Sequence, residues 1–121
     1  MEVKKFIDEQ MEFLGVPYEF GEWTSEVEYP YFVGEVTEPD QTTEDGLEEP
    51  YFILTGFHRG KYIDLEIIKE KIKKHFQDLR ASIDSGSIAV FYGGAFYVPT
   101  GEADLKKLQI NLNIKTWKGD L

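Results

Sequence analysis

The sequence predicts a single α+β domain over residues 1–121, with a largely antiparallel sheet of about five or six strands and two helices packed on one face. Three observations lead to this fold class. Two segments repeat apolar residues at helical spacing, several others are rich in aromatic and β-branched residues, and turn residues separate them. A chain of this length hides roughly two-thirds of its surface, which is enough for one core and no second one.

The first expected element is a helix over Glu2–Leu14. Its apolar residues recur at helical spacing, and Gly15 followed by Pro17 ends it. The apolar positions are Val3, Phe6, Ile7, Met11 and Leu14. A short strand over residues 16–20 is expected next, at a sheet edge because Pro17 lacks an amide hydrogen. Residues 21–28 are then expected to form a connection.

Two further strands are expected at Tyr31–Thr37 and Tyr51–His58, because both segments are rich in aromatic and β-branched residues. Between them we expect a mobile acidic loop over about residues 38–50. This stretch has proline near each end and one aliphatic residue, Leu47. It therefore buries too little apolar area to offset the entropy of ordering, and it joins the two strands in antiparallel order.

A second helix is expected to begin at Asp64, whose carboxylate suits the N-cap position. One apolar stripe then extends along it. The stripe consists of Leu65, Ile68, Ile72, Phe76 and Leu79. Four lysines follow towards its end, where cations suit the helix dipole, and we interpret them as a solvated outer face. They are Lys69, Lys71, Lys73 and Lys74.

The C-terminal third predicts three strands. Residues 87–92 and 95–98 are interpreted as a hairpin that turns at Gly93–Gly94, and residues 99–104 as a second turn. The last strand, residues 107–117, alternates between polar and apolar residues from Lys107 to Lys115 and ends in Thr116 and Trp117. One of its faces therefore belongs to the core, and the other meets water or a partner.

The net charge of −10 is concentrated in one segment. Ten of the 23 acidic residues lie between Glu22 and Pro50, where there is no Lys or Arg. Such a patch repels phosphate groups and disfavours ordinary nucleic-acid binding. The acidic residues also do not match the calcium-binding loop of an EF-hand. If the loop pattern starts at Asp40, its sixth position, which requires glycine, is Asp45, and its twelfth position, which requires glutamate, is Tyr51.

Catalytic, metal and cofactor motifs are missing from the sequence. There is no cysteine, and the two histidines, His58 and His75, belong to no catalytic or metal-binding pattern. No glycine loop links a strand to a helix in the way that phosphate binding requires. We therefore expect no enzyme activity, no cofactor and no metal. The apolar runs are far shorter than the ~20 residues of a membrane helix, and no signal peptide is evident, so we expect a soluble intracellular protein without a membrane partner.

The aromatic residues point to protein binding. Seven Tyr, nine Phe and two Trp are more than a small core needs, and exposed Tyr and Trp are typical of interfaces. The candidates for the open face of the sheet or its edges are Trp23, Tyr29, Tyr31, Tyr92, Tyr97 and Trp117. Together with the polar face of the last strand, the expected interface residues are Trp23, Tyr29, Tyr31, Gln109, Asn111, Asn113 and Trp117.

The order of elements, with the segments EYPYFVGE (residues 28–35) and YFILTGFH (residues 51–58), resembles the tail terminator or tail-completion proteins of long-tailed bacteriophages and prophages. The resemblance covers nearly the whole chain. It implies a non-enzymatic structural protein that forms a ring, commonly a hexamer, at the head–tail junction. Its partners would be copies of itself, the tail tube and head-completion proteins, in the virion and earlier in the host cytoplasm.

The resemblance also offers a role for the acidic segment. DNA passes through such a ring without specific binding, and carboxylates that face the channel would repel its phosphates. The candidate channel-facing or partner-facing acids are Asp40, Glu44, Asp45, Glu48 and Glu49. The alternative is an acidic inhibitor or DNA mimic whose carboxylates occupy a basic cleft on a host enzyme.

Overall fold

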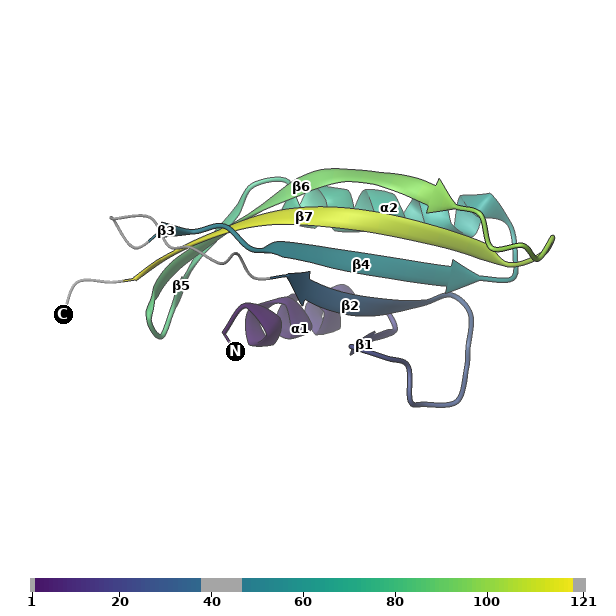
Figure 1. Cartoon of the computed structure of the whole chain (residues 1–121), viewed down its shortest axis with the longest axis horizontal. Coiled ribbons are helices and arrows are strands. Elements are labelled where there is room, and N and C mark those ends of the chain that lie inside the picture. The colour runs from purple at the N-terminus through teal and green to yellow at the C-terminus, as the bar shows by residue number, and fades with distance from the viewer. Residues whose placement is uncertain (1, 38–46, 119–121) are drawn as a thin grey trace.

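A computed structural model describes residues 2–37 and 47–118 and places two helices against one curled, mostly antiparallel sheet (Figure 1). The helices are α1 (Glu2–Leu14) and α2 (Tyr62–Phe76). The strands are β1 (Tyr18–Phe20), β2 (Tyr31–Thr37), β3 (Leu47–Glu48), β4 (Tyr51–His58), β5 (Leu79–Ile83), β6 (Gly86–Val98) and β7 (Lys106–Lys118). Six strands follow the order β1-β2-β4-β7-β6-β5, and β3 pairs with β7 outside that order. The predicted α+β class is confirmed.

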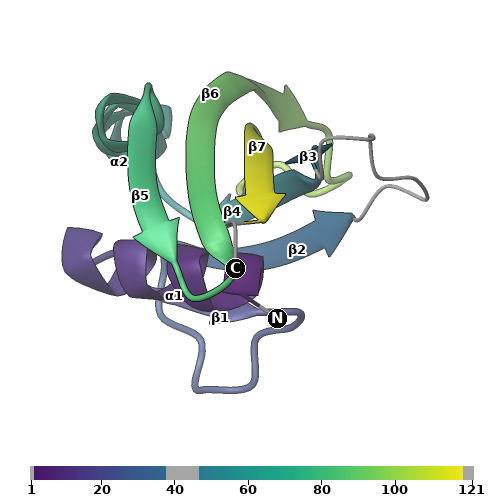
Figure 2. The same ribbon diagram turned by 90° about the vertical axis from the view of Figure 1, so that its left-hand side faces the viewer.

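The core lies between the sheet and both helices. Helix α1 buries the predicted residues Phe6, Ile7, Met11 and Leu14, and α2 buries Leu65, Ile72 and Phe76. All of these side chains belong to one cluster with the inward residues of the sheet. Figure 2 shows both helices against the curled sheet, with β7 near its middle. The helices therefore pack on one face of the sheet, as the sequence predicts.

Strand β7 has one face in the core and one face that is accessible to solvent. Leu108, Ile110, Leu112 and Ile114 are buried, whereas the alternate residues remain at least partly accessible. The strand pairs with β4 on one side and β6 on the other, both antiparallel. Its alternation therefore propagates to both neighbours, because paired residues point to the same face of a sheet.

The N-terminal edge agrees closely with the sequence. Strands β2 and β4 have the predicted bounds and pair antiparallel along the whole of β2. Strand β1 lies at the edge and pairs parallel with β2. In this region Gly56 lies opposite Phe32 in register, and the Phe32 ring occupies the space where a side chain at Gly56 would be. Close packing across the pair thus depends on glycine.

Two expectations for α2 are wrong. The helix begins at Tyr62, so Asp64 lies in its first turn rather than at the N-cap. The preceding residue, Lys61, makes no side-chain cap hydrogen bond. At the other end the helix stops at Phe76, and Leu79 opens the unpredicted strand β5. Leu79 continues the helical spacing only by coincidence, since it packs on the same core from the sheet.

The hairpin predicted at Gly93–Gly94 is also wrong. Residues 86–98 form one continuous strand, β6, and Gly93–Gly94 lie at a bulge where the register with β7 shifts. The real hairpin joins β5 to β6. The bulge adds one residue to β6, so Tyr92 and Tyr97 both face the core, although they are five residues apart. They were expected on the open face of the sheet or at its edges. The turn expected at residues 99–104 is present, between β6 and β7.

The acidic loop predicted over residues 38–50 needs one correction. Leu47–Glu48 form the short strand β3, which pairs antiparallel with Trp117 and Thr116 of β7. Nine residues of the predicted loop, 38–46, lie outside the described residues. The apolar content of the segment is low, but backbone pairing with β7 requires no apolar side chain, and this pairing orders its end.

Placing a carboxylate inside the core should prevent folding. We expect the Ile110→Asp protein to be unfolded, because Ile110 is fully buried and an unpaired buried charge costs several kcal/mol against a total stability of roughly 5–15 kcal/mol. Circular dichroism and thermal melting test this. The matched control is Asn111→Asp on the opposite face of β7, which should melt like the parent. Equal stability of both variants would contradict the register of β7.

A single methyl group at Gly56 should also destabilise the fold. A Cβ atom there would lie 2.5 Å from two ring carbons of the buried Phe32. We expect Gly56→Ala to lower the free energy of unfolding by about 1–3 kcal/mol, the usual cost of overpacking. Denaturant titration measures it. Thr37→Ala, at an exposed position of the neighbouring strand, should change the free energy far less.

Candidate functional site

The face of the sheet that points away from both helices is the main candidate site. Within residues 2–37 and 47–118 no helix lies over it, since α1 and α2 both belong to the core. We call it the open face. By register and alternation it carries Tyr31, Val33, Glu35 and Thr37 of β2, Tyr51, Ile53, Thr55 and Phe57 of β4, the odd-numbered residues 107–117 of β7, and Phe91, Phe96 and Val98 of β6.

Four aromatic side chains form a continuous cluster at one end of the open face. The ring centroid of Tyr31 lies 4.7 Å from that of Trp23, 5.7 Å from that of Tyr29 and 5.2 Å from that of Phe57. We call these four residues the aromatic cluster. Ring pairs at such distances contribute beyond their buried area, so the cluster forms a preorganised apolar surface.

A tight turn after β1 positions Trp23. The carboxylate of Glu19 accepts hydrogen bonds from the Thr24 hydroxyl at 2.6 Å and from the Ser25 amide at 3.2 Å. The Thr24 hydrogen bond lowers the pKa of Glu19, which keeps the carboxylate ionised and the turn closed. The indole of Trp23 also donates to the Glu26 carbonyl at 3.3 Å. By holding the turn at Thr24 and Ser25, Glu19 keeps the Trp23 ring in contact with Tyr31.

Arg59 joins the aromatic cluster to the turn between β6 and β7. It donates to the Tyr29 hydroxyl at 3.1 Å and forms ion pairs with Glu102 at 2.8 Å and Asp104 at 3.0 Å. The hydrogen bond to Tyr29 and the two carboxylates raise the pKa of Arg59. These contacts hold the Tyr29 side chain in place, and they engage the guanidinium group of Arg59 in hydrogen bonds to other residues of the same chain.

The centre of the open face combines exposed rings with amides. Tyr51 is 59% exposed and Phe96 is 49% exposed. Between them in the sheet lie Gln109, Asn111 and Asn113 of β7, whose amides can donate and accept hydrogen bonds. Apolar rings among neutral polar groups are typical of the buried centre of a protein–protein interface.

All seven predicted interface residues lie on this side of the sheet. Trp23, Tyr29 and Tyr31 meet in the aromatic cluster, and Gln109, Asn111, Asn113 and Trp117 follow one another along β7. Several residues of this surface were not predicted. They include Tyr51, Ile53, Phe57 and Phe96. The sequence of β4 does not alternate between apolar and polar residues, so the first three are placed only by pairing with β7, whereas Phe96 depends on the bulge in β6.

Two of the five predicted acidic residues, Glu48 and Glu49, belong to the part of the chain that the structure describes. Asp40, Glu44 and Asp45 lie outside the described residues. Glu48 belongs to β3, and Glu49 is exposed with a carboxylate oxygen 3.6 Å from the Lys115 ammonium. Glu49 is therefore neutralised by a neighbour on the open face, and its role in lining a channel stays a prediction.

Each histidine has a structural partner. Nε2 of the buried His58 lies 2.8 Å from the Asp64 carboxylate, and this hydrogen bond lowers the pKa of Asp64. The pair ties the end of β4 to the first turn of α2. Nε2 of His75 lies 2.7 Å from the amide oxygen of Gln10, so it links α2 to α1. Burial lowers the pKa of His75 and favours its neutral form.

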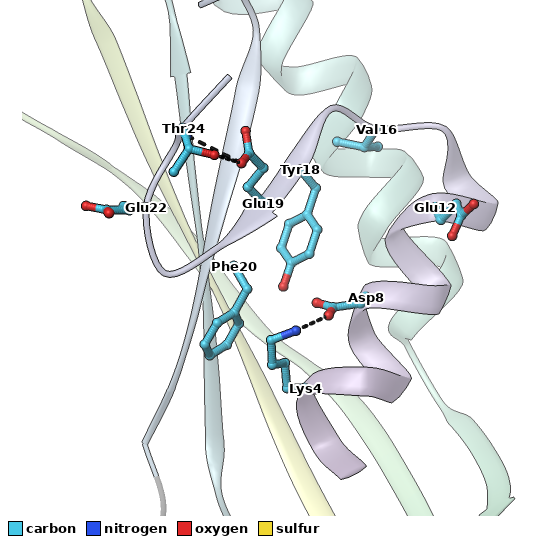
Figure 3. Close-up of a pocket in the computed structure, with 9 residues that line it drawn as sticks. All are labelled: Lys4, Asp8, Glu12, Val16, Tyr18, Glu19, Phe20, Glu22 and Thr24. Carbon is cyan, nitrogen blue, oxygen red and sulfur yellow. Dashed lines mark hydrogen bonds and ion pairs between the residues drawn. The ribbon is translucent and has the colours of Figure 1, made fainter. Parts of the chain in front are cut away.

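An open pocket of about 700 Å³ lies between α1 and β1 (Figure 3). Its charged residues are Lys4, Asp8, Glu12, Glu19 and Glu22. Lys4 pairs with Asp8 at 2.5 Å, and Figure 3 shows the Tyr18 hydroxyl pointing towards Asp8. Burial raises the pKa of Tyr18, and the neighbouring Asp8 raises it further.

The hydroxyl groups of the pocket belong to Tyr18 and Thr24. With its raised pKa, Tyr18 remains protonated and is unsuited to act as a general base. Thr24 donates to Glu19, but that carboxylate has a lowered pKa and is a weak base. Among the described residues, no group of three or more His, Asp or Glu side chains has an arrangement that could hold a metal ion.

No protein-family model matches the chain, and no curated protein matches it at a significant level. In the described part of the chain, neither helix is both long and apolar enough to cross a membrane. The surface features above therefore provide the basis for a functional proposal.

Acid should weaken the contact between the two helices through His75. Since burial lowers its pKa, the folded protein binds this proton less tightly than the unfolded chain does. The contribution to the free energy of unfolding is complete above the ordinary pKa of about 6.5 and decreases as the pH falls through it. We expect denaturant titrations at neutral and mildly acidic pH to show this decrease in the parent and a smaller one in His75→Gln. Equal decreases would contradict the assignment.

Proposed function

We propose that this protein is a non-enzymatic structural protein of a long-tailed bacteriophage or prophage, which assembles into a ring at the head–tail junction and terminates or completes the tail tube. The observation that carries the proposal is the open face, where a continuous aromatic cluster and two further exposed rings lie on a sheet with a helix layer on its other side only. The resemblance over residues 28–35 and 51–58 supplies the phage context.

Self-assembly follows from the cost of leaving such a surface in water. Contiguous exposed apolar groups are unusual on a monomer and typically mark an interaction site. Within the described residues, β1 and β5 lie at the two ends of the six-strand order, where their outer backbone groups invite further contacts. A closed ring of identical subunits covers the same surfaces on every subunit through repeated contacts.

The charge of the protein agrees with a passage for DNA. Glu22, Glu26 and Glu28 are exposed on the segment before β2, in a chain with a net charge of −10. A ring repeats these carboxylates on every subunit, so its surface repels phosphate groups and lets DNA pass without specific binding. The partners under this proposal are the tail tube and a head-completion protein.

A second candidate is the acidic inhibitor. The pocket between α1 and β1 favours it, because four carboxylates gather there and could receive basic side chains of a host enzyme. The four are Asp8, Glu12, Glu19 and Glu22. In that case the partner would be a basic cleft, and the protein would act as a monomer.

The deciding experiment adds purified protein to tail tubes of a related phage and images the tube ends by electron microscopy. We expect a ring at one end of each tube. Phe96→Asp provides the matched control, since Phe96 is exposed and its replacement should preserve the fold while preventing the ring. Bare tube ends, together with tight binding to a host nuclease or polymerase, would refute the tail-terminator proposal and support the inhibitor.

A further inference from the structure

Helix α2 carries a second stripe that the core does not use. Leu65, Ile72 and Phe76 face the sheet and are fully buried. On the outer side, Ile63 and Ile67 are 56% and 62% exposed, and the exposed Lys71 and Lys74 continue the same line towards the end of the helix. Their spacing of four, four and three residues places all four on one side of the helix. We call these four residues the outer stripe.

The centre of the open face complements the outer stripe, because it combines apolar side chains with a negative charge. Tyr51 and Ile53 of β4 provide apolar side chains there, and Glu35 of β2 faces outward beside Ile53 in register, whereas Phe96 of β6 lies on the far side of the β7 amides. Glu35 is exposed and makes no ion pair with another described residue. On the open face, the exposed carboxylate of Glu35 therefore lies next to apolar side chains. On the outer stripe, the ammonium groups of Lys71 and Lys74 likewise lie next to the two isoleucines.

The basic groups of the open face are already engaged. Lys115 pairs with Glu49, and Arg80 on β5 pairs with Asp78 at 3.0 Å. Lys107 lies over the ring of Phe57, 5.8 Å from its centroid, at the far end of the face. Among the described residues, Glu35 thus carries the charge without an ionic partner at the centre of the open face.

The two surfaces lie on opposite sides of the molecule. Helix α2 covers the core face of β6 and β7, so its outer side points away from the open face, as Figure 2 shows from the positions of α2 and these strands. One subunit can therefore use both surfaces at the same time with two different neighbours. This is the geometric requirement for a head-to-tail contact.

We propose that the outer stripe of one copy docks on the centre of the open face of a second copy. Ile63 and Ile67, one helical turn apart, pack on Tyr51 and Ile53, which are two residues apart on one face of β4, while Lys71 and Lys74 lie next to Glu35. The contact rests on the ring proposed above and names the two surfaces that form it. It requires no phage component.

Charge favours this contact over a symmetric one. Two open faces placed against each other would bring two Glu35 carboxylates into one interface, and two outer stripes would bring four lysines together. Like charges across an interface oppose association, whereas the head-to-tail arrangement pairs each carboxylate with ammonium groups. The partner that the charges select is therefore the opposite surface of another copy.

Cysteine cross-linking tests the contact directly, because the chain has no cysteine. Glu70→Cys chains, which carry an exposed thiol beside the outer stripe and keep Ile67, are mixed with Phe96→Cys chains and treated with a short bismaleimide. We expect the mixed dimer to form about tenfold faster than a dimer of either variant alone, since docking raises the effective concentration of the paired thiols. A chain with both substitutions should give a ladder of oligomers. Phe13→Cys, 78% exposed on α1, is the matched control for random collisions.

Charge reversal provides the second measurement. Glu35→Lys in the Phe96→Cys chain should slow formation of the mixed dimer, and Lys71→Glu with Lys74→Glu in the partner chain should restore the rate. Faster cross-linking of Phe96→Cys with itself, or a mixed rate no higher than that of the Phe13→Cys control, would overturn the proposal.

The outcome separates this contact from the proposed function. If the mixed dimer forms but tubes are not capped, the phage role fails and the head-to-tail contact remains. If tubes are capped but the mixed rate equals that of the control, a ring exists that uses other surfaces, and the inference is wrong.

Discussion

The alternation of β7 is the constraint on which the rest of the structure depends. Leu108, Ile110, Leu112 and Ile114 close the core under both helices, and the residues between them form the middle of the open face. Strands β3, β4 and β6 all pair with β7, and one register places the side chains of β4, β6 and β7. A shift of this register by one residue would exchange core and surface. The stability of the domain and the chemistry of its candidate interface therefore have the same origin.

The bulge at Gly93–Gly94 shifts the register between β6 and β7 by one residue and so decides which side chains of β6 face the core. Because it adds one residue, Tyr92 and Tyr97 both reach the core face, and Phe91 and Phe96 both reach the open face. Tyr97 then donates to Glu66 of α2 at 2.6 Å, which fastens the helix to the sheet from the inside. Phe96, on the other side, becomes one of the exposed rings of the open face. A local irregularity in one strand thus supports both the core and the surface that we propose for assembly.

The two outer surfaces of the domain, the outer side of α2 and the open face of the sheet, differ in charge and residue type. This difference influences which surfaces of two copies can bind each other. The helix side presents two isoleucines followed by lysines, and the sheet side presents rings and amides around Glu35. Surfaces of unlike charge favour repeated head-to-tail contacts, which close into a ring when the rotation between copies allows it. The acidic residues before β2 lie outside this contact and remain available to repel phosphate groups.

Residue patterns alone determined much of this protein. The bounds of α1 and the buried face of β7 follow from spacing, because apolar residues at periods of 3.6 and 2 must face the core. The bounds of β2 and β4 follow from their aromatic and β-branched residues, and Trp23, Tyr29 and Tyr31 were expected on the open side because of the high aromatic content. Tertiary structure decided the remainder. Leu79 fits a helical stripe but joins a strand, Gly93–Gly94 suit a turn but form a bulge, and Leu47 pairs with β7 although its segment is polar. Each of these positions is determined by backbone pairing with a strand far away in sequence, and local residue patterns carry no information about such a partner.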